Sequence, residues 1–283
     1  MIASGKELSD KLKAKMAEEV ANFPEKYGRV PHLVVILVGD DPASVSYVTG
    51  KATAASVVGI KATTLRKSES MTEEELLALI AELNADDSVD GILVQLPLPK
   101  HINEDRVIAA ISKEKDVDGF HPGNVAALWQ GLDCIYPCTP LGVMRLFQEH
   151  GVELEGKRAV VVGRSTIVGL PMVKLLLDAN ATVTVAHSRT KNLAEITSQA
   201  EILVVAVGSP RLIKADMVAE GAVVMDVGVN RDPVTGRLCG DVDFDEVAPK
   251  ASIITPVPGG IGPMTICCLM ENTITCFLRK MNK

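Results

Sequence analysis

The sequence lacks the cysteine and histidine patterns that mark a metal site. Its six cysteines contain no C-x-x-C pair, and none of its five histidines lies at zinc-ligand spacing from another. Cys134 and Cys138 bracket a short proline-containing stretch, so a metal or redox role is conceivable there, but no second ligand pair supports it. We therefore predict reduced, mostly buried cysteines and no bound metal.

Two further absences limit the partners and the compartment. The chain has no excess of basic residues, and its formal net charge of −7 opposes binding to nucleic acid, which usually requires a basic stripe or patch. No stretch approaches the roughly 20 apolar residues that cross a bilayer. The first 20 residues are charged throughout rather than signal-like. We therefore predict a cytoplasmic protein with no nucleic-acid or membrane partner.

The sequence is rich in apolar strands that alternate with amphipathic helices. With 283 residues, 47% of them hydrophobic, the chain can bury a large core, and its length suggests about two domains. The alternation occurs in two series, 32–99 and 157–228, and predicts two α/β domains with parallel, helix-covered sheets. The last apolar helix is predicted to return to the first domain. The predicted domains are therefore 1–139 plus 263–283, and 140–262.

A glycine-containing turn in the second series has the context of a dinucleotide site. The stretch AVVVGRSTIVGLPM (159–172) follows a strand and opens a helix. Its pattern, Gly163-x-Ser165-x-x-x-Gly169, departs from G-x-G-x-x-G. The Ser165 hydroxyl can donate to a phosphate, and a helix N-terminus favours an anion. The alternative is an ordinary tight turn between strand and helix that binds no ligand.

The next strand favours NADP over NAD. NAD-binding versions of this fold usually carry an acidic residue about 20 residues after the turn, whereas arginine there accommodates the 2′-phosphate of NADP. Here that strand ends in HSRT, and Arg164 adds a second cation. Two solvated arginines are the alternative. The predicted cofactor-binding residues are Gly163, Arg164, Ser165, Ile167, His187, Ser188, Arg189, Gly208, Pro210 and Val229.

Together with this turn, the remaining motifs resemble one family over nearly the whole chain. They are SYVTGK (46–51), DGILVQLPLP (90–99), KDVDGFHP (115–122), PCTPLG (137–142), VVGRSTIVGLP (161–171), HSRT (187–190), DVGVN (226–230), GDVDF (240–244) and TPVPGGIGPMT (255–265). Their order and spacing resemble the bifunctional methylenetetrahydrofolate dehydrogenase and methenyltetrahydrofolate cyclohydrolase family. Departures are minor: Ile261 stands where valine is common, and Cys267 and Cys268 occupy core-helix positions.

The resemblance implies a fold, two reactions and an assembly. The first α/β domain would carry a folate site and the second, Rossmann-like domain would bind NADP, with a cleft between them and a homodimer as the assembly. The reactions would be oxidation of 5,10-methylenetetrahydrofolate by NADP to the methenyl cation, and hydrolysis of that cation to 10-formyltetrahydrofolate. Both belong to one-carbon metabolism, and the resemblance extends to a role in purine biosynthesis.

The Y-x-x-x-K pattern formed by Tyr47 and Lys51 resembles the folate-site pair of that family. Side chains four residues apart lie on one helix face. Short-chain dehydrogenases share the pattern, but there it follows the dinucleotide turn, and here it lies far ahead of it. Lys51 is the candidate for proton transfer, because burial and a nearby cationic substrate disfavour its charged form. A solvated helix lysine is the alternative.

Other residues are expected to support this lysine and the folate. Gln95 ends an apolar strand and is costly to bury alone, so we expect it to bond Lys51 or the reacting group, or backbone in a purely structural role. Asp118 should accept hydrogen bonds from the pteridine ring, unless it only forms the turn before Gly119. Tyr47 offers a flat face to the aminobenzoyl ring, or is a core tyrosine.

The loop PVPGGIGP is predicted to approach the flat ligand closely, with an ordinary linker as its alternative. The predicted catalytic residues are Lys51, Gln95, Tyr47 and Asp118. The predicted substrate-binding residues are these four with Leu96, Pro97, Pro258, Gly259 and Gly260. Two other functions remain open at this point: a shikimate-type NADP oxidoreductase acting on a small alcohol, and a non-catalytic nucleotide-binding or interaction protein.

Overall fold

A computed structural model describes residues 1–232 and 235–282 of the chain. The chain forms two compact units: unit 1 contains Met1–Ser9 and Thr139–Thr265, and unit 2 contains Asp10–Cys138 and Ile266–Lys283. Each unit is an α/β structure with a parallel sheet, as predicted. The predicted boundaries differ from this division at the start of the chain. Residues 1–9 lie in unit 1, because the Ala3 N–H donates to the Ile254 carbonyl oxygen at 2.8 Å and Ile2 bridges Ile254.

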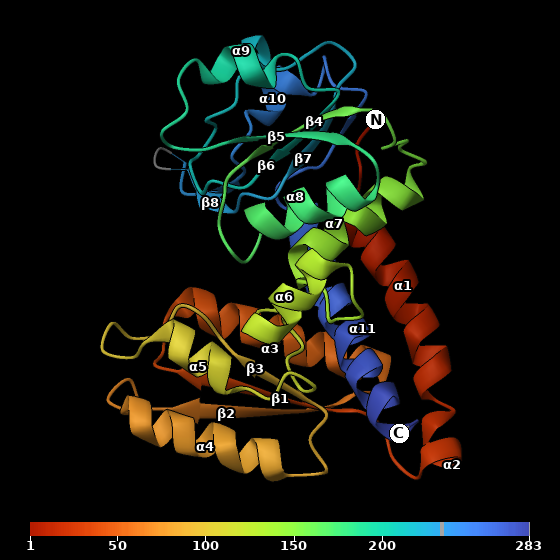
Figure 1. Cartoon of the computed structure of the whole chain (residues 1–283), viewed down its shortest axis with the longest axis vertical. Helices are drawn as coiled ribbons and strands as arrows, with labels where there is room; N and C mark the ends of the chain where they lie inside the picture. The colour runs from red at the N-terminus through yellow and green to blue at the C-terminus, as the bar shows by residue number, and fades with distance from the viewer. Residues whose placement is uncertain (233–234, 283) are drawn as a thin grey trace. The chain divides into compact units, whose positions relative to one another are not determined.

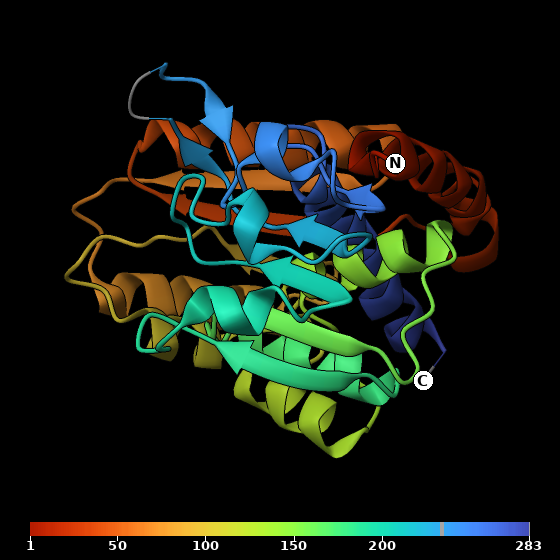
Figure 2. The same cartoon turned by 90° about the horizontal axis from the view of Figure 1, so that it is seen from above.

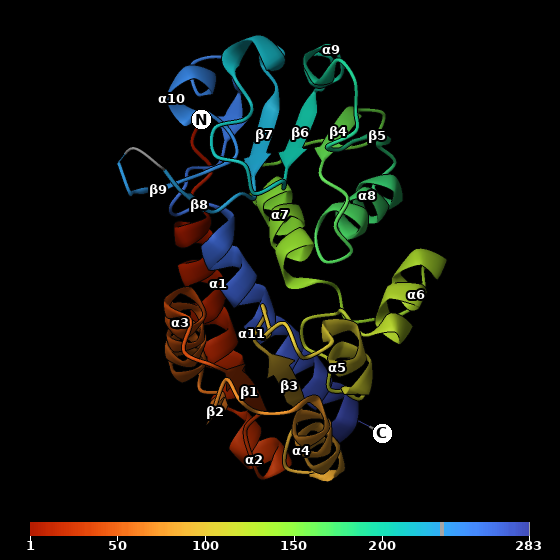
Figure 3. The same ribbon diagram turned by 90° about the vertical axis from the view of Figure 1, so that its left-hand side faces the viewer.

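Unit 2 is built on a three-stranded parallel sheet in the order β2-β1-β3. The central strand β1 (His32–Val38) is buried along its whole length, which explains why its sequence HLVVILV is continuously apolar rather than alternating. Its neighbours are β2 (Lys61–Lys67) and β3 (Gly91–Val94). Figure 3 shows α3 (Pro42–Val58) on one side of this sheet, and α4 (Glu73–Ala85) and α5 (Glu104–Ala110) on the other.

The helices of unit 2 begin where the sequence supplies caps. At α4 the Thr72 hydroxyl accepts from the Glu75 N–H while the Glu75 carboxylate accepts from the Thr72 N–H, which satisfies two otherwise unpaired donors. The shorter helices are α2 (Phe23–Tyr27) and α6 (Pro122–Gln130). Helices α1 (Gly5–Val20), α7 (Cys138–Glu149) and α11 (Ile261–Met281) have residues in both units.

Unit 1 is built on a five-stranded parallel sheet in the order β10-β7-β6-β4-β5, whose strands lie side by side in Figure 2. The strands are β4 (Arg158–Val162), β5 (Thr182–Ala186), β6 (Ile202–Val205), β7 (Val223–Asp226) and β10 (Ile253–Ile254). The strand order reverses between β4 and β6, and in open α/β sheets ligands bind at such a point, beyond the carboxyl ends of the strands. The fold of unit 1 therefore places a ligand edge at the ends of β4, β5, β6 and β7.

Helices cover both faces of this sheet. Residues of α9 (Leu193–Thr197) and α10 (Phe244–Val247) pack into the apolar core on one face, and Figure 1 shows α8 (Gly169–Asp178) on the other. A one-turn 3-10 helix η1 (Ala215–Met217) and a two-stranded antiparallel sheet of β8 (Asn230–Arg231) and β9 (Leu238–Cys239) complete the unit. Covered faces explain the continuous apolar runs in β4 and β6.

The last helix and the cysteines have structural roles. Helix α11 is long and apolar enough to cross a membrane by length and composition, but 61% of its most apolar window is buried in the protein, as in a core helix. All six cysteines are buried. Within residues 1–232 and 235–282 there is no group of three or more His, Cys, Asp and Glu side chains arranged to hold a metal ion.

Candidate active site

Helix α3 presents Tyr47 and Lys51 one turn apart. It starts sharply because the Asp41 carboxylate accepts from the Ser44 N–H at 2.8 Å and Pro42 occupies its first turn. The two side chains differ in exposure: Tyr47 is 42% exposed, whereas Lys51 is 9% exposed. Tyr47 is therefore not a core tyrosine, and Lys51 is not a solvated lysine.

Lys51 is paired with Gln95, which follows β3. The Lys51 Nζ donates to Gln95 Oε1 at 2.8 Å, and Gln95 Nε2 donates to the Leu96 carbonyl at 2.6 Å. An ammonium can only donate and a carbonyl can only accept, so these partners determine the orientation of the amide. This contact confirms the predicted hydrogen bond between the two residues. Leu96, half-buried, and Pro97, exposed, follow directly along the chain.

Asp118 carries an unusual carboxyl group in the same unit. Burial raises its pKa to about 6, although the Lys51 ammonium opposes this shift. The Cys138 thiol donates to Asp118 Oδ1 over 3.9 Å. Because Lys51 lowers the pKa of Asp118, the two charged groups are close enough to interact. Lys51, Gln95 and Asp118 therefore form one polar cluster in unit 2.

Asp116, which sequence reasoning missed, performs the turn-forming role that was considered for Asp118. Its carboxylate accepts from the N–H groups of Gly119 at 3.1 Å and His121 at 2.8 Å, and from Asn124 Nδ2 at 2.8 Å. An aspartate three residues before a glycine can cap a turn in this way, so the spacing in KDVDGFHP contained a usable signal. Because Asp116 satisfies these donors, the Asp118 carboxyl is not needed for the turn.

The dinucleotide turn of unit 1 depends on Gly163. Its φ of +128° is accessible mainly to glycine, and a Cβ there would overlap the carbonyl oxygen of Ala206. Ser165 Oγ accepts from the N–H groups of Val168 and Gly169, each at 3.2 Å. A hydroxyl that accepts two bonds keeps its own hydrogen for donation, so Ser165 can still donate to a phosphate. Ile167, in the same exposed turn, is 37% exposed.

The turn that follows β5 leaves the sheet beside this one. Val162 pairs with Ala186 in the β4–β5 register, and the Arg189 N–H donates to His187 Nδ1 at 3.1 Å. Ser188 is exposed. Arg164 and Arg189 are also exposed, and neither guanidinium contacts an acidic group in the described part of the chain. Adjacent cations without acidic partners fit an anionic group such as a phosphate.

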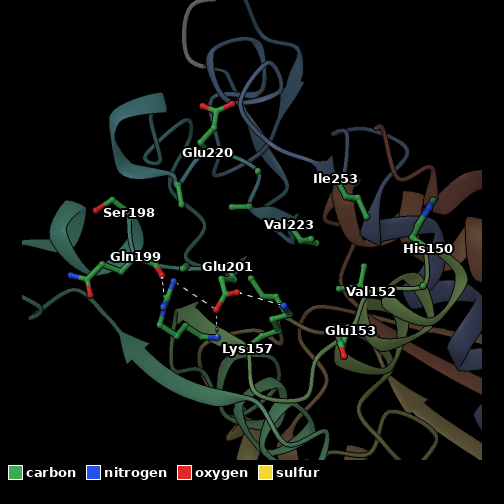
Figure 4. A pocket seen from close by; sticks show the side chains of 17 residues that line it. His150, Val152, Glu153, Lys157, Ser198, Gln199, Glu201, Glu220, Val223 and Ile253 are labelled. Carbon is green, nitrogen blue, oxygen red and sulfur yellow. Dashed lines mark hydrogen bonds and ion pairs between the residues drawn. The ribbon is translucent and has the colours of Figure 1, made fainter.

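The remaining predicted cofactor residues lie at the carboxyl edge of the same sheet. Gly208 and Pro210 follow β6, Val229 follows β7, and all three are exposed. A pocket of about 480 Å³ lies at the opposite edge, where its lining includes the first residues of β4, β6 and β7 (Figure 4). Ion pairs of Glu201 with Lys157 and Arg158 neutralise its cations. This pocket is therefore separate from the predicted nucleotide edge.

The predicted folate loop residues Pro258, Gly259 and Gly260 belong to unit 1, whereas the other predicted folate residues belong to unit 2. Pro258 is exposed. The Gly259 carbonyl accepts from the Lys6 N–H at 2.9 Å, and its φ is +101°. A Cβ at Gly260 would overlap the carbonyl oxygen of Pro256. Glycine is therefore required here by the conformation and packing of the loop itself.

Comparison with known protein families matches both halves of the chain to domains of one enzyme. Residues 3–118 match the catalytic domain of tetrahydrofolate dehydrogenase/cyclohydrolase, and residues 137–281 match the NAD(P)-binding domain of the same enzyme. The chain belongs to the tetrahydrofolate dehydrogenase/cyclohydrolase family. The membership decides against the shikimate-type alternative.

Relatives in this family are similar over their full length. The chain is 57% identical to the bifunctional protein FolD of Lactococcus lactis subsp. cremoris, covering 100% of this chain and 98% of that one. A crystal structure of the bifunctional enzyme FolD from Campylobacter jejuni has 51% identity and a TM-score of 0.96, with 99% of each chain covered. The Trypanosoma brucei enzyme, solved with NADP and an inhibitor, has 39% identity and a TM-score of 0.96, covering 100% of this chain and 99% of that one.

Proposed function

We propose that the protein oxidises 5,10-methylenetetrahydrofolate with NADP and hydrolyses the resulting 5,10-methenyltetrahydrofolate to 10-formyltetrahydrofolate. The observation that carries this proposal is the buried Lys51 ammonium bonded to Gln95 in a chain of this family. The names of the bacterial relatives describe a bifunctional protein, and the Trypanosoma brucei relative binds NADP. Both steps would act on the same one-carbon bridge of the folate.

The chain's residues fit NADP at the carboxyl edge of unit 1. When bound, NADP accepts the hydride that leaves the methylene carbon. We assign the 2′-phosphate to Arg164 and Arg189, whose turns leave the sheet side by side. The Ser165 hydroxyl supplies a donor for the pyrophosphate, and the N-terminus of α8 favours its negative charge. The rest of the cofactor site would be lined by Gly208, Pro210 and Val229.

Hydride transfer requires orientation more than proton transfer. Loss of hydride from a carbon between two nitrogens gives a delocalised cation directly, so no base is needed in this step. We assign the orientation of the folate to Tyr47, whose exposed ring can stack on the aminobenzoyl group, and to Asp118, whose ionised carboxyl can accept from the pteridine N–H groups. Leu96 and Pro97, which follow Gln95 in the same unit, would extend this part of the folate site, and Pro258, Gly259 and Gly260 stay predicted folate contacts.

Hydrolysis requires a group that carries protons. Water adds to the methenyl carbon and loses a proton, and the ring opens as a C–N bond breaks and the nitrogen gains a proton. We assign both transfers to Lys51, with the neutral amine accepting the first proton and the ammonium returning it. Gln95 keeps the amine in place, because its own amide is held by the Leu96 carbonyl. Gln95 is therefore assigned to orientation of the amine.

We further propose that the protein acts as a homodimer in the cytoplasm, in the one-carbon metabolism that feeds purine biosynthesis. The support for these points is the family membership and the family resemblance of the motifs. Gel filtration with light scattering would test the assembly, since a homodimer of this 30.1 kDa chain elutes at twice the monomer mass. A monomeric mass at assay concentration would reject the dimer.

The function itself is tested by one incubation with two readouts. The full chain is mixed with methylenetetrahydrofolate and NADP, and NADPH formation and methenyl absorbance are followed separately. We expect NADPH to form, with methenyl absorbance that rises and then falls as hydrolysis proceeds. Absence of both signals would reject the proposal, and NADP binding without folate turnover would favour a non-catalytic nucleotide-binding protein.

A further inference from the structure

Two buried aspartates lie beneath the loops that end β6 and β7 in unit 1. Asp226, the last residue of β7, is 3% exposed, and Asp241 is fully buried. Neither carboxylate forms an ion pair with a Lys, Arg or His side chain among residues 1–232 and 235–282. A buried carboxylate without a cation is costly unless hydrogen bonds replace its water. The hydrogen bonds that these two carboxylates accept replace that water.

Asp241 holds both loops at once. Its Oδ2 accepts from the N–H groups of Val207 at 2.7 Å and Gly208 at 3.0 Å, and its Oδ1 accepts from the Ser209 N–H at 2.8 Å. The same Oδ1 accepts from Asn230 Nδ2 at 2.8 Å. Three consecutive N–H groups after β6 therefore point at one carboxylate, and the loop after β7 is tied to it as well.

Asp226 holds Asp241 in turn. Its Oδ1 accepts from the N–H groups of Asp241 and Gly228, each at 3.0 Å, and its Oδ2 accepts from the Val242 N–H at 2.9 Å. A Cβ at Gly228 would overlap the Asp241 carboxylate, and a Cβ at Gly240 would overlap the Asp226 carboxylate. The glycines of DVGVN and GDVDF therefore allow the backbone to approach the two carboxylates closely.

This arrangement adjoins the dinucleotide turn. Ala206, whose carbonyl oxygen packs against Gly163, immediately precedes the three residues that Asp241 holds. Gly208 and Val229, by contrast, face outward and are exposed. The inner side of each loop is thus held by a carboxylate, while its outer side remains available to a ligand.

We propose that Asp241 is a positioning residue for NADP: it sets the shape of the loops after β6 and β7, and Asp226 keeps it in place. The inference rests on the proposed function, because it takes this edge as the NADP site. Asp241 is fully buried and acts on the cofactor only through the loops. The N–H groups of residues 207–209 are used by the carboxylate, so the loop after β6 meets the cofactor with side chains and carbonyl oxygens.

The test is Asp241→Asn in the full chain, with NADP binding measured by calorimetry. Asparagine has the same shape, but an NH₂ group replaces one carboxylate oxygen. The N–H groups that donated to that oxygen lose their acceptor, so the loops shift. We expect NADP to bind at least about tenfold more weakly. Methenyltetrahydrofolate hydrolysis, assigned to unit 2, should stay within about twofold because it consumes no NADP. Asp216→Asn, an exposed change in the same unit, is the matched control and should alter neither.

A milder variant keeps the test decisive if Asp241→Asn folds poorly. Asn230→Ala removes only the Nδ2–Oδ1 bond of a half-exposed residue, and should weaken NADP about threefold with an unchanged melting temperature. Wild-type NADP affinity in folded variants would overturn the inference, as would equal loss of NADP binding and hydrolysis. NADP binding is measured without folate. Failure of the folate chemistry alone would therefore reject the proposed function, but the effect of each variant on NADP affinity could still be interpreted.

Discussion

The two units prepare their sites in different ways. In unit 2 the proposed site consists of side-chain atoms from separate elements, with the Lys51 amine of α3 bonded to the Gln95 amide beyond β3. In unit 1 it consists mainly of backbone shape, in which Gly163 packs on Ala206 and buried Asp241 holds residues 207–209. Proton transfer needs one particular titratable atom, whereas an elongated cofactor needs a long surface of defined shape.

This difference predicts separable effects of substitution. Removing one atom in unit 2 should abolish a chemical step, whereas changing the backbone shape in unit 1 should weaken NADP and leave hydrolysis intact. Because one chain carries out both reactions, each activity serves as the folding control for the other. The four tests below, three of this separation and one of the stability of unit 2, follow in decreasing order of expected effect.

The largest effect should follow Lys51→Met. Methionine fills similar volume but carries no proton, so hydrolysis of the methenyl compound should fall by about a thousandfold. Hydride transfer, which needs no base, should fall by less than about tenfold. Stopped-flow absorbance would follow NADPH and the methenyl compound separately. Lys61→Met, an exposed lysine of β2, is the matched control. Equal loss of both activities would mean that Lys51 mainly positions the folate.

Gly163→Ala tests the opposite arrangement, in which backbone shape carries the site. The new Cβ would overlap the Ala206 carbonyl oxygen at a φ of +128°, so the turn must distort. We expect NADP affinity to fall by on the order of a hundredfold, about 2.7 kcal/mol, while hydrolysis persists. Gly156→Ala, outside the proposed site, is the control: its φ is +72°, but a Cβ there has no neighbour within 4 Å. Equal losses in the two variants would show that φ alone, rather than overlap with Ala206, determines the effect.

The same contrast explains what could be predicted from the sequence. The alternating series predicted two α/β units, because covered parallel strands must be continuously apolar and their helices amphipathic. The Lys51–Gln95 contact was predictable because a polar residue ending an apolar strand needs a partner, and the motif resemblance indicated a lysine. Residues whose role follows from local pattern and solvation were therefore accessible before any coordinates.

Contacts between distant backbone segments were not predictable in this way. Asp226 and Asp241 both lie within the family motifs, yet their role depends on N–H groups that only the folded chain brings to them. The contacts of residues 1–9 with unit 1 were not foreseen for the same reason, since a single bridge from Ile2 to Ile254 carries no sequence period. Asp116 lay within reach, because its spacing to Gly119 is typical of a capped turn.

The arginine pair should have a more moderate effect on unit 1. Arg164→Ala combined with Arg189→Ala removes two exposed cations, so NADP affinity should fall by about tenfold while NAD affinity changes by less than about twofold. Calorimetry with both nucleotides at two salt concentrations would measure this, since added salt should shrink the NADP preference of the wild type. Arg158→Ala, at the opposite edge of the sheet, is the control. Equal weakening of NAD and NADP would remove the 2′-phosphate assignment.

The smallest effect concerns the stability of unit 2. Burial raises the pKa of Asp118 from its ordinary value of 3.8 to about 6, so the folded state favours its protonated form. This contribution to the free energy of unfolding is fully present below pH 3.8 and is lost as the pH rises through about 6. Asparagine does not titrate, so Asp118→Asn does not lose this contribution. Its melting temperature minus that of the wild type should therefore rise by a few degrees from pH 4 to pH 8.

Subtracting the wild-type melting temperature from that of Asp118→Asn separates the effect of Asp118 from that of the other carboxyl group with a raised pKa. Burial also raises the pKa of Asp226, to about 7, but this group is present in both proteins and its effect cancels on subtraction. Asp116→Asn is the contrasting variant: it leaves buried N–H groups without an acceptor, so it should destabilise the protein at pH 4 and pH 8 alike. A melting difference between Asp118→Asn and the wild type that does not change with pH would show that Asp118 acts as a packing residue. The polar cluster of unit 2 would then rest on the bond between Lys51 and Gln95 alone.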